Sequence, residues 1–140
     1  MGIVLRRIGA DDASLFESIA PDVFDEPVDT ARLAAYLTTP GHLMLLALEG
    51  ERVVGQCAAV VHRHPDKPTE LYVDELGTAA THRRQGIGRR LLAEMFDWGR
   101  ELGATEAWLG TELDNAAANA LYRGFAPIED EAIRYYLFRL

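Results

Sequence analysis

Residues 82–90, HRRQGIGRR, decide how the chain is interpreted, since they follow an apolar run and lead into an amphipathic one. The stretch combines four arginines with Gly86 and Gly88. A strand-to-helix turn presents free backbone N–H groups and the positive end of a helix dipole. Glycine lets a ligand approach the backbone without meeting a Cβ atom. The stretch therefore predicts a phosphate-binding turn, with a solvated helix start as the alternative.

The spacing of the glycines separates this turn from two other phosphate loops. It is neither G-x-x-x-x-G-K-[ST] nor G-x-G-x-x-G at a first strand–helix turn, so a P-loop and a dinucleotide site are not expected. Positive charge at a helix N-terminus opposes the helix dipole. A bound anion would compensate for the arginine cluster.

Hydrophobic patterning extends the prediction outward from the turn. Residues 86–102 form the clearest helix, because apolar residues recur every three or four positions. Strands are expected over 3–8, 43–48, 52–62, 70–78, 105–110, 125–128 and 132–138. Further helices are expected over 10–24, from an Asp29 or Thr30 cap to Leu37, and from an Asp114 cap to Tyr122.

These segments predict one α/β (α+β) domain over residues 1–140, in the order β-α-α-β-β-β-α-β-α-β-β. The fold would be a mixed twisted sheet of about seven strands with helices on both faces. The chain of 140 residues is 49% hydrophobic and 26% charged, which are the values of a globular domain.

Composition also limits the expected binding partners and the expected cellular compartment. A net charge of -8 argues against nucleic acid, because phosphate neutralisation needs a basic surface. No apolar run approaches the ~20 residues that cross a bilayer, and the first residues lack the apolar core of a leader. The single cysteine, Cys57, cannot form an internal disulfide, so a cytoplasmic location is expected.

The turn and its surroundings resemble the GCN5-related N-acetyltransferases. Residues 82–90 match the family's R-x-x-G-x-G loop, residues 76–78 resemble its L-x-V strand end, and residues 115–122 resemble its N-x-x-A-x-x-L-Y helix. The order of elements is the family's as well. Residues 70–76 and 82–87 are also similar to aminoglycoside 3-N-acetyltransferases of the gentamicin-resistance type.

The resemblance implies that acetyl-coenzyme A is the acetyl donor and binds against the turn. Amides of the turn would hold the pyrophosphate, and the strand end before it would offer backbone groups to the pantetheine arm. The residues that the resemblance implies for coenzyme binding are Leu76, Gly77, Thr78, Arg83, Arg84, Gln85, Gly86, Ile87, Gly88, Arg89 and Asn115.

Acetyl transfer needs a neutral amine, and a lysine-like amine of pKa ~10.4 costs about 4.6 kcal/mol to deprotonate at pH 7. Glu75 is the first candidate for the base and Asp74 is the second. Strand alternation predicts that the two side chains lie on opposite faces, so that only one faces the acceptor. A salt-bridged strand carboxylate is the structural alternative for either.

Tyr122 is the candidate acid for the leaving thiolate. Asn115, Ala118, Asn119 and Tyr122 share one helix face by their spacing. The family usually has L-Y-x-K-x-G-F, whereas residues 121–125 read LYRGF, which is two residues shorter and could move the hydroxyl. A packed aromatic side chain is the structural alternative.

Acidic residues cluster in the two regions that flank the family's acceptor site. The candidate acceptor-binding residues are Asp22, Asp25, Glu26, Asp130 and Glu131. They would suit a small polycationic amine, an aminoglycoside before a polyamine, and hence a role in antibiotic resistance. Ordinary solubility charge is the alternative explanation.

Three functions remain open from the sequence. They are acetylation of a small polycation, acetylation of a protein N-terminus or lysine, and a non-catalytic acetyl-coenzyme A sensor. The sequence leaves open whether the chain is a monomer or a homodimer. No metal is expected, because the one close histidine pair, His62 and His64, lies at a strand end with no third ligand in view and is interpreted as surface.

Overall fold

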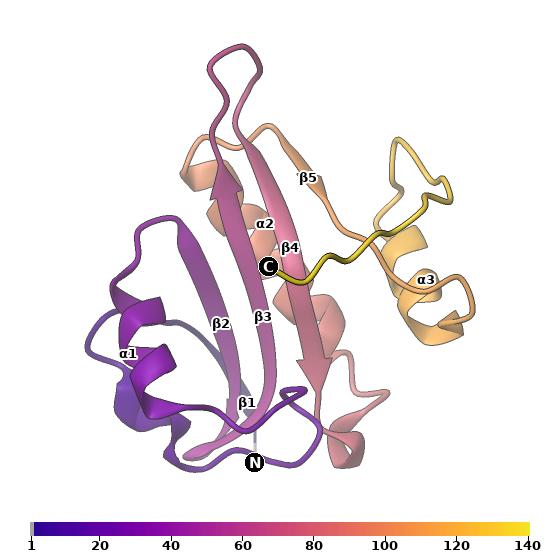
Figure 1. Ribbon diagram of the computed structural model, residues 1–140. Helices are drawn as coiled ribbons and strands as arrows, with labels where there is room; N and C mark the ends of the chain where they lie inside the picture. Colours follow the sequence, from indigo (N-terminus) through magenta and orange to yellow (C-terminus); the bar gives the residue numbers. More distant parts are fainter. Residues whose placement is uncertain (1) are drawn as a thin grey trace. The chain divides into compact units, whose positions relative to one another are not determined.

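Five strands form one sheet in the spatial order of the chain (Figure 1). They are β1 (Ile3–Arg7), β2 (His42–Glu49), β3 (Arg52–His62), β4 (Glu70–Thr78) and β5 (Glu106–Trp108). The first four are antiparallel, and β5 joins β4 in parallel. A parallel pair needs a crossover connection, which the chain supplies with a helix after β4. The expected strands of this region are confirmed, and β3 and β4 end where the sequence predicts.

The computed structural model describes residues 2–140, and the chain divides into two units, Met1–Leu109 and Gly110–Leu140. The sheet belongs to the first unit. Within residues 2–140, no helix combines the length and the apolar composition that a bilayer crossing demands.

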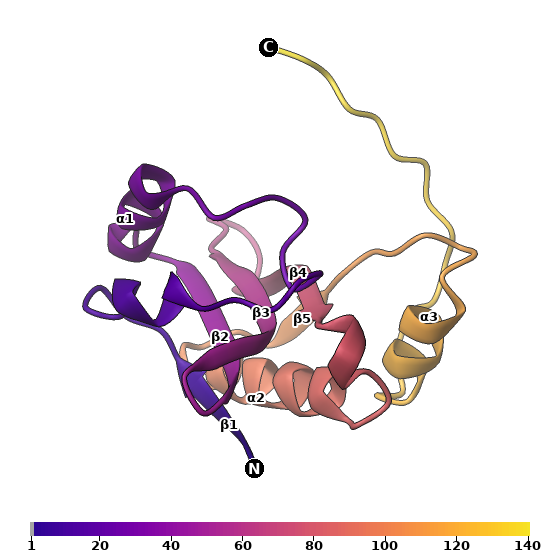
Figure 2. The same ribbon diagram turned by 90° about the horizontal axis from the view of Figure 1, so that it is seen from below.

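The helix α2 (Ile87–Glu101) covers one face of the sheet (Figure 2). Its periodic apolar side buries Ile87, Leu91, Leu92 and Met95. Gly99 lets the helix approach β4, because a Cβ atom there would lie 2.8 Å from the Leu71 side chain. This packing holds α2 against the sheet along its length, from Ile87 to Gly99.

The other face carries the short 3-10 helix η1 (Ala13–Glu17) and the helix α1 (Thr30–Thr38). Asp29 caps α1, accepting from the Arg32 amide at 2.8 Å. The helix expected over 10–24 is wrong beyond η1. The Ser18 carbonyl and the Ala20 amide bond to Val53, at 2.8 and 2.9 Å, so the backbone pairs with the sheet instead of coiling.

The second unit contains α3 (Ala116–Arg123), capped by Asn115 and not by Asp114. The strands expected over 125–128 and 132–138 are wrong, because residues 124–140 carry no helix or strand. The sheet therefore has five strands and not seven. A strand is defined by its ladder, and these residues have strand-type side chains without one.

Candidate active site

The glycine-rich stretch forms the connection between β4 and α2. Ala79 is buried and its amide donates to Val54 at 2.9 Å, which anchors the short helix η2 (Ala80–His82). The His82 Nε2 then lies 3.2 Å from the Glu49 carboxylate. Two of the residues that follow have positive φ, Arg84 at 62° and Gly86 at 77°. These left-handed positions turn the chain sharply into α2.

The start of α2 has the properties of an anion site. Gly86 is its N-cap and offers no side-chain acceptor to the first-turn amides. Arg83, Arg84 and Arg89 are exposed around the turn, and Gly88 is half-buried. Ile87 is 2% exposed, so its side chain belongs to the core and only its backbone faces the turn. The arrangement fits a pyrophosphate held by backbone N–H groups and flanked by guanidinium groups.

The strand end before the turn has an open edge. The pairing of β4 with β5 covers only Glu70 to Tyr72, opposite Glu106 to Trp108. Within residues 2–109, Val73 and residues 75–78 pair with β3 on one side, and the whole stretch 73–78 has no ladder partner on the other. This open stretch includes Leu76, Gly77 and Thr78, whose backbone groups are thus available to a ligand.

Gly77 also has a packing reason to be glycine. A Cβ atom at this position would lie 2.3 Å from the Val23 carbonyl oxygen. That same oxygen accepts a bond from the Gln56 amide at 3.3 Å. Gly77 therefore lets the loop after η1 lie directly on β4.

The two candidate bases lie beside a β-bulge. Ala58 is opposite Glu75, whereas Ala59 is opposite Val73, so Asp74 is the extra residue of β4. A bulge breaks the simple alternation of side chains along a strand. The expected placement on opposite faces is therefore wrong. Asp74 lies on the same face as Tyr72 by alternation along β4, and Glu75 lies opposite Ala58 on that face of the sheet. Both side chains thus share the face that packs under α1.

Electrostatics supports this common placement. Burial, followed by the charges of Asp25 and Asp74, raises the pKa of Glu75. Burial also raises the pKa of Asp74, although a backbone hydrogen bond and the electrostatic effect of His42 act to lower it. Burial raises the pKa of Tyr36 on α1, and the charges of both carboxylates add to that effect. A carboxylate with a raised pKa is a stronger base than one in water.

A hollow of about 410 Å³ opens between η1, α1 and the bulge. Its acidic lining comprises Asp25, Glu26, Asp29 and Glu75, with Arg32 as the one cation. Its apolar lining comprises Phe16, Phe24, Val28, Leu33, Tyr36 and Met44. A second hollow of about 350 Å³ includes Asp22 and shares Asp25 and Glu26 with the first. Two of the predicted acceptor-binding residues, Asp25 and Glu26, thus line one hollow with the candidate base Glu75, and Asp22 lines the adjoining hollow.

Sequence reasoning missed the α1 side chains of this hollow. Tyr36 lies on it and donates to the Leu43 carbonyl at 3.1 Å, which holds the ring in place. The helical spacing of Asp29, Leu33 and Tyr36 places them on one face and was the available signal.

Cys57 is not a candidate nucleophile. Its side chain is fully buried in β3. Burial, with a smaller effect of Asp74, raises the pKa of the thiol to about 12. The thiol therefore stays protonated at neutral pH.

The remaining predicted residues lie in the second unit. The Asn115 side chain accepts from the Ala118 amide at 3.1 Å as the cap of α3. Tyr122 lies in the last turn of α3 and is partly exposed. Asp130 accepts from Arg123 at 2.9 Å, and Glu131 is exposed.

The fold and this arrangement define a class of protein, the acetyltransferases that bind coenzyme A at such a turn. The family model described as "Acetyltransferase (GNAT) family" matches residues 12–125. The chain belongs to the acetyltransferase (GNAT) family.

Individual relatives agree with this assignment. The N-alpha-acetyltransferase RimI of Mycobacterium tuberculosis is 34% identical over 118 residues, which cover 84% of this chain and 68% of that protein. A probable N-acetyltransferase HLS1 of Arabidopsis thaliana is 33% identical over 128 residues, covering 76% of this chain. The chain spans only 30% of the length of that plant relative.

Solved structures extend the likeness over the whole chain. The aminoglycoside acetyltransferase meta-AAC0020, from an uncultured soil metagenomic sample and in complex with sisomicin, has a TM-score of 0.82. The match covers 99% of this chain and 96% of that one, at 20% identity. At that identity the likeness shows the fold alone.

Proposed function

We propose that the chain is an acetyl-coenzyme A-dependent N-acetyltransferase that acts on a primary amine of a small polycationic substrate, with aminoglycosides as the first class to test. The observation that carries this proposal is the acidic hollow, in which Asp25, Glu26 and Glu75 meet beside the open end of β4. The same strand leads directly into the anion-binding turn.

The donor supplies an acetyl group activated as a thioester. First-turn amides of α2 would hold its pyrophosphate, and Arg83, Arg84 and Arg89 would add positive charge. The open edge at residues 76–78 would hold the pantetheine arm through backbone hydrogen bonds. These assignments need no side chain other than those exposed at the turn.

Glu75 accepts a proton from the ammonium group of the acceptor, directly or through one water, and frees the lone pair that attacks the acetyl carbon. Its raised pKa supports this role. Asp74, on the same face, keeps a second negative charge near the amine. We propose that Tyr122 protonates the departing thiolate and that Asn115 contacts the coenzyme arm.

Charge supports a cationic acceptor. Four carboxylates and one guanidinium line the hollow, and the chain as a whole carries a net charge of -8. Neighbouring ammonium groups lower each other's pKa, which eases deprotonation of a polyamine. An aminoglycoside as substrate would make antibiotic resistance the biological role. The single buried cysteine supports a cytoplasmic location.

A peptide N-terminus is the second candidate acceptor. One sequence relative, which matches 84% of this chain, carries the name N-alpha-acetyltransferase. The apolar wall of the hollow, with Phe24 and Met44, also suits a peptide side chain. The activity is the same, and only the acceptor differs.

Release of free coenzyme A thiol, measured against a panel of aminoglycosides, polyamines and peptides, tests the proposal. We expect turnover with the first two classes and a KM that rises with salt, because charges are screened over ~8 Å at physiological ionic strength. Turnover with peptides alone would replace the polycation with the second candidate. Gly88→Tyr should abolish donor binding in calorimetry, and donor binding without turnover on any amine would favour a sensor.

A further inference from the structure

A group of metal-binding side chains lies at the opposite end of β4 from the proposed active site. His62 ends β3, Glu70 begins β4, and the two residues are register partners. His64 lies in the hairpin loop between them. The sequence suggested no third ligand for the histidine pair, because a loop separates the pair from Glu70 and the pairing of β3 with β4 brings that residue opposite His62. Among residues 2–140, these three form the one such cluster with ligand atoms within 4.8 Å of one another.

We propose that His62, His64 and Glu70 bind a divalent transition metal ion, Zn²⁺ first. Two imidazoles and a carboxylate are the ligand types that Zn²⁺ takes, and three protein ligands leave a fourth position for water. The proposed acetyl transfer does not use these residues.

The distances match a shared ion. The Nδ1 of His62 and the Nε2 of His64 each lie 3.3 Å from the Glu70 Oε1. In a tetrahedral Zn²⁺ site, bonds of about 2.0–2.2 Å place neighbouring ligand atoms about 3.3–3.6 Å apart. Two edges of the ligand triangle already have this length. The third edge joins the ligand nitrogens of the two histidines. A small rotation of the exposed His62 ring can bring these two atoms to the same separation.

An unsatisfied atom supports the same conclusion. The His64 Nε2 is buried and lies 3.3 Å from the Glu70 Oε1, but the two atoms are not well aligned for a hydrogen bond. A buried polar atom without a partner is costly, and a metal bond would satisfy it. The His64 side chain is only 14% exposed, so its ring is held in this orientation.

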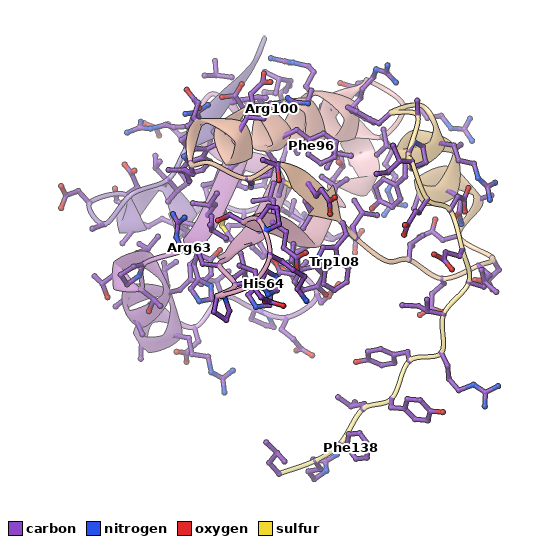
Figure 3. The ribbon with its side chains drawn as sticks, turned by 90° about the horizontal axis from the view of Figure 1, so that it is seen from above. Arg63, His64, Phe96, Arg100, Trp108 and Phe138 are labelled. Carbon is purple, nitrogen blue, oxygen red and sulfur yellow. The ribbon has the colours of Figure 1, made fainter. Side chains whose placement is uncertain are left out.

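A supporting residue positions the carboxylate. The indole Nε1 of Trp108, on β5, donates to the Glu70 Oε1 at 3.2 Å, and its ring stacks on Tyr72. His64 and Trp108 lie near each other in Figure 3. Hydrogen bonds from a surrounding shell are a general feature of metal sites, because they fix the ligand and tune its basicity. The bound ion would join β3, β4 and β5 at this end of the sheet.

Calorimetric titration of the tag-free, chelator-treated full chain with ZnCl₂ tests the site. We expect one ion per chain, with MgCl₂ giving no binding. His62→Ala and Glu70→Gln should each weaken Zn²⁺ binding by at least about tenfold. The control His42→Ala, which also removes one histidine, should bind as the wild type does. Cobalt(II) should give a tetrahedral visible spectrum in the wild type and not in His62→Ala.

His62 is more than half exposed, so its variant should keep the fold, as circular dichroism can verify. The Glu70→Gln variant retains an oxygen that accepts from Trp108. Failure of the wild type to bind Zn²⁺ would overturn the site. Equal affinities of His62→Ala, Glu70→Gln and His42→Ala would show adventitious surface binding only, which also overturns it.

Discussion

Two segments of this chain, residues 43–48 in β2 and residues 133–138 near the C-terminus, are both rich in large apolar or aromatic side chains and have opposite surroundings. LMLLAL in β2 is at most 7% exposed and pairs with β1 on one side and β3 on the other. In IRYYLF, the apolar and aromatic residues are 68–81% exposed, and no ladder includes them. Phe138, labelled in Figure 3, projects from this extended backbone.

The difference shows what strand-type composition can specify. Branched and aromatic residues favour extended backbone, but a strand becomes stable only when its N–H and C=O groups meet another edge. In β2 the neighbouring hairpin provides that edge within a few residues. Residues 132–138 pair with no neighbouring segment, so this backbone remains without a ladder.

The largest expected effect comes from making the same substitution in the two units. Leu45→Ala removes a side chain with no exposure and should lower the free energy of unfolding by about 2–5 kcal/mol. Leu113→Ala, in the second unit, removes one that is 81% exposed and should change it by less than about 0.5 kcal/mol. Urea unfolding of both variants measures this. Equal losses would mean that the second unit has a core of its own.

Two glycine-to-alanine substitutions form a second matched pair of variants. Gly77→Ala should lower the free energy of unfolding by about 1–3 kcal/mol, because its Cβ meets the Val23 carbonyl oxygen at 2.3 Å. A Cβ atom at position 110 would have no neighbour within 4 Å, so Gly110→Ala should leave the free energy of unfolding nearly unchanged. Thermal unfolding compares them. A neutral Gly77→Ala would show that the loop at Val23 moves freely off β4.

The elements that the sequence predicted well are those whose signals are local. The period of α2, the apolar run of β3 and the glycine turn at Gly86 are each set by neighbouring residues. The bulge at Asp74 was not predictable, because it depends on the register between β3 and β4. The irregular path after Glu17 was missed for the same reason, since Val53 supplies its hydrogen bonds from the sheet.

The candidate site follows the same division. The turn and Glu75 were found from sequence motifs. The shared face of Asp74 and Glu75, and the place of Tyr36 over them, required the fold. Glu70 likewise joins His62 and His64 only through the hairpin.

The exposed segment also bears on the oligomeric state. We propose a homodimer in which residues 132–138 pair with a sheet edge of a second copy, because such a ladder would bury Ile133, Tyr135 and Leu137 on one face. Light scattering after gel filtration should give the mass of two chains. The Leu137→Asp variant should have the mass of one chain. The control variant Ile128→Asp should keep the mass of two chains, because Ile128 is 91% exposed and lies outside the segment. A wild-type mass of one chain at every concentration would contradict the dimer.

The central claim is that Glu75 takes the proton of a cationic amine, and the pH profile of kcat/KM tests it most directly. In the wild type, the acid limb should fall as Glu75 becomes protonated, at a pH above its ordinary pKa of 4.5, because burial and Asp25 raise that pKa. Asp25→Asn removes a negative charge and should move the limb to lower pH. Glu75→Gln should lower the rate at pH 7 by about 10²–10⁴-fold, recovering in part at high pH where the amine is already neutral. A full rate for Glu75→Gln at pH 7, with an unchanged acid limb, would contradict the account.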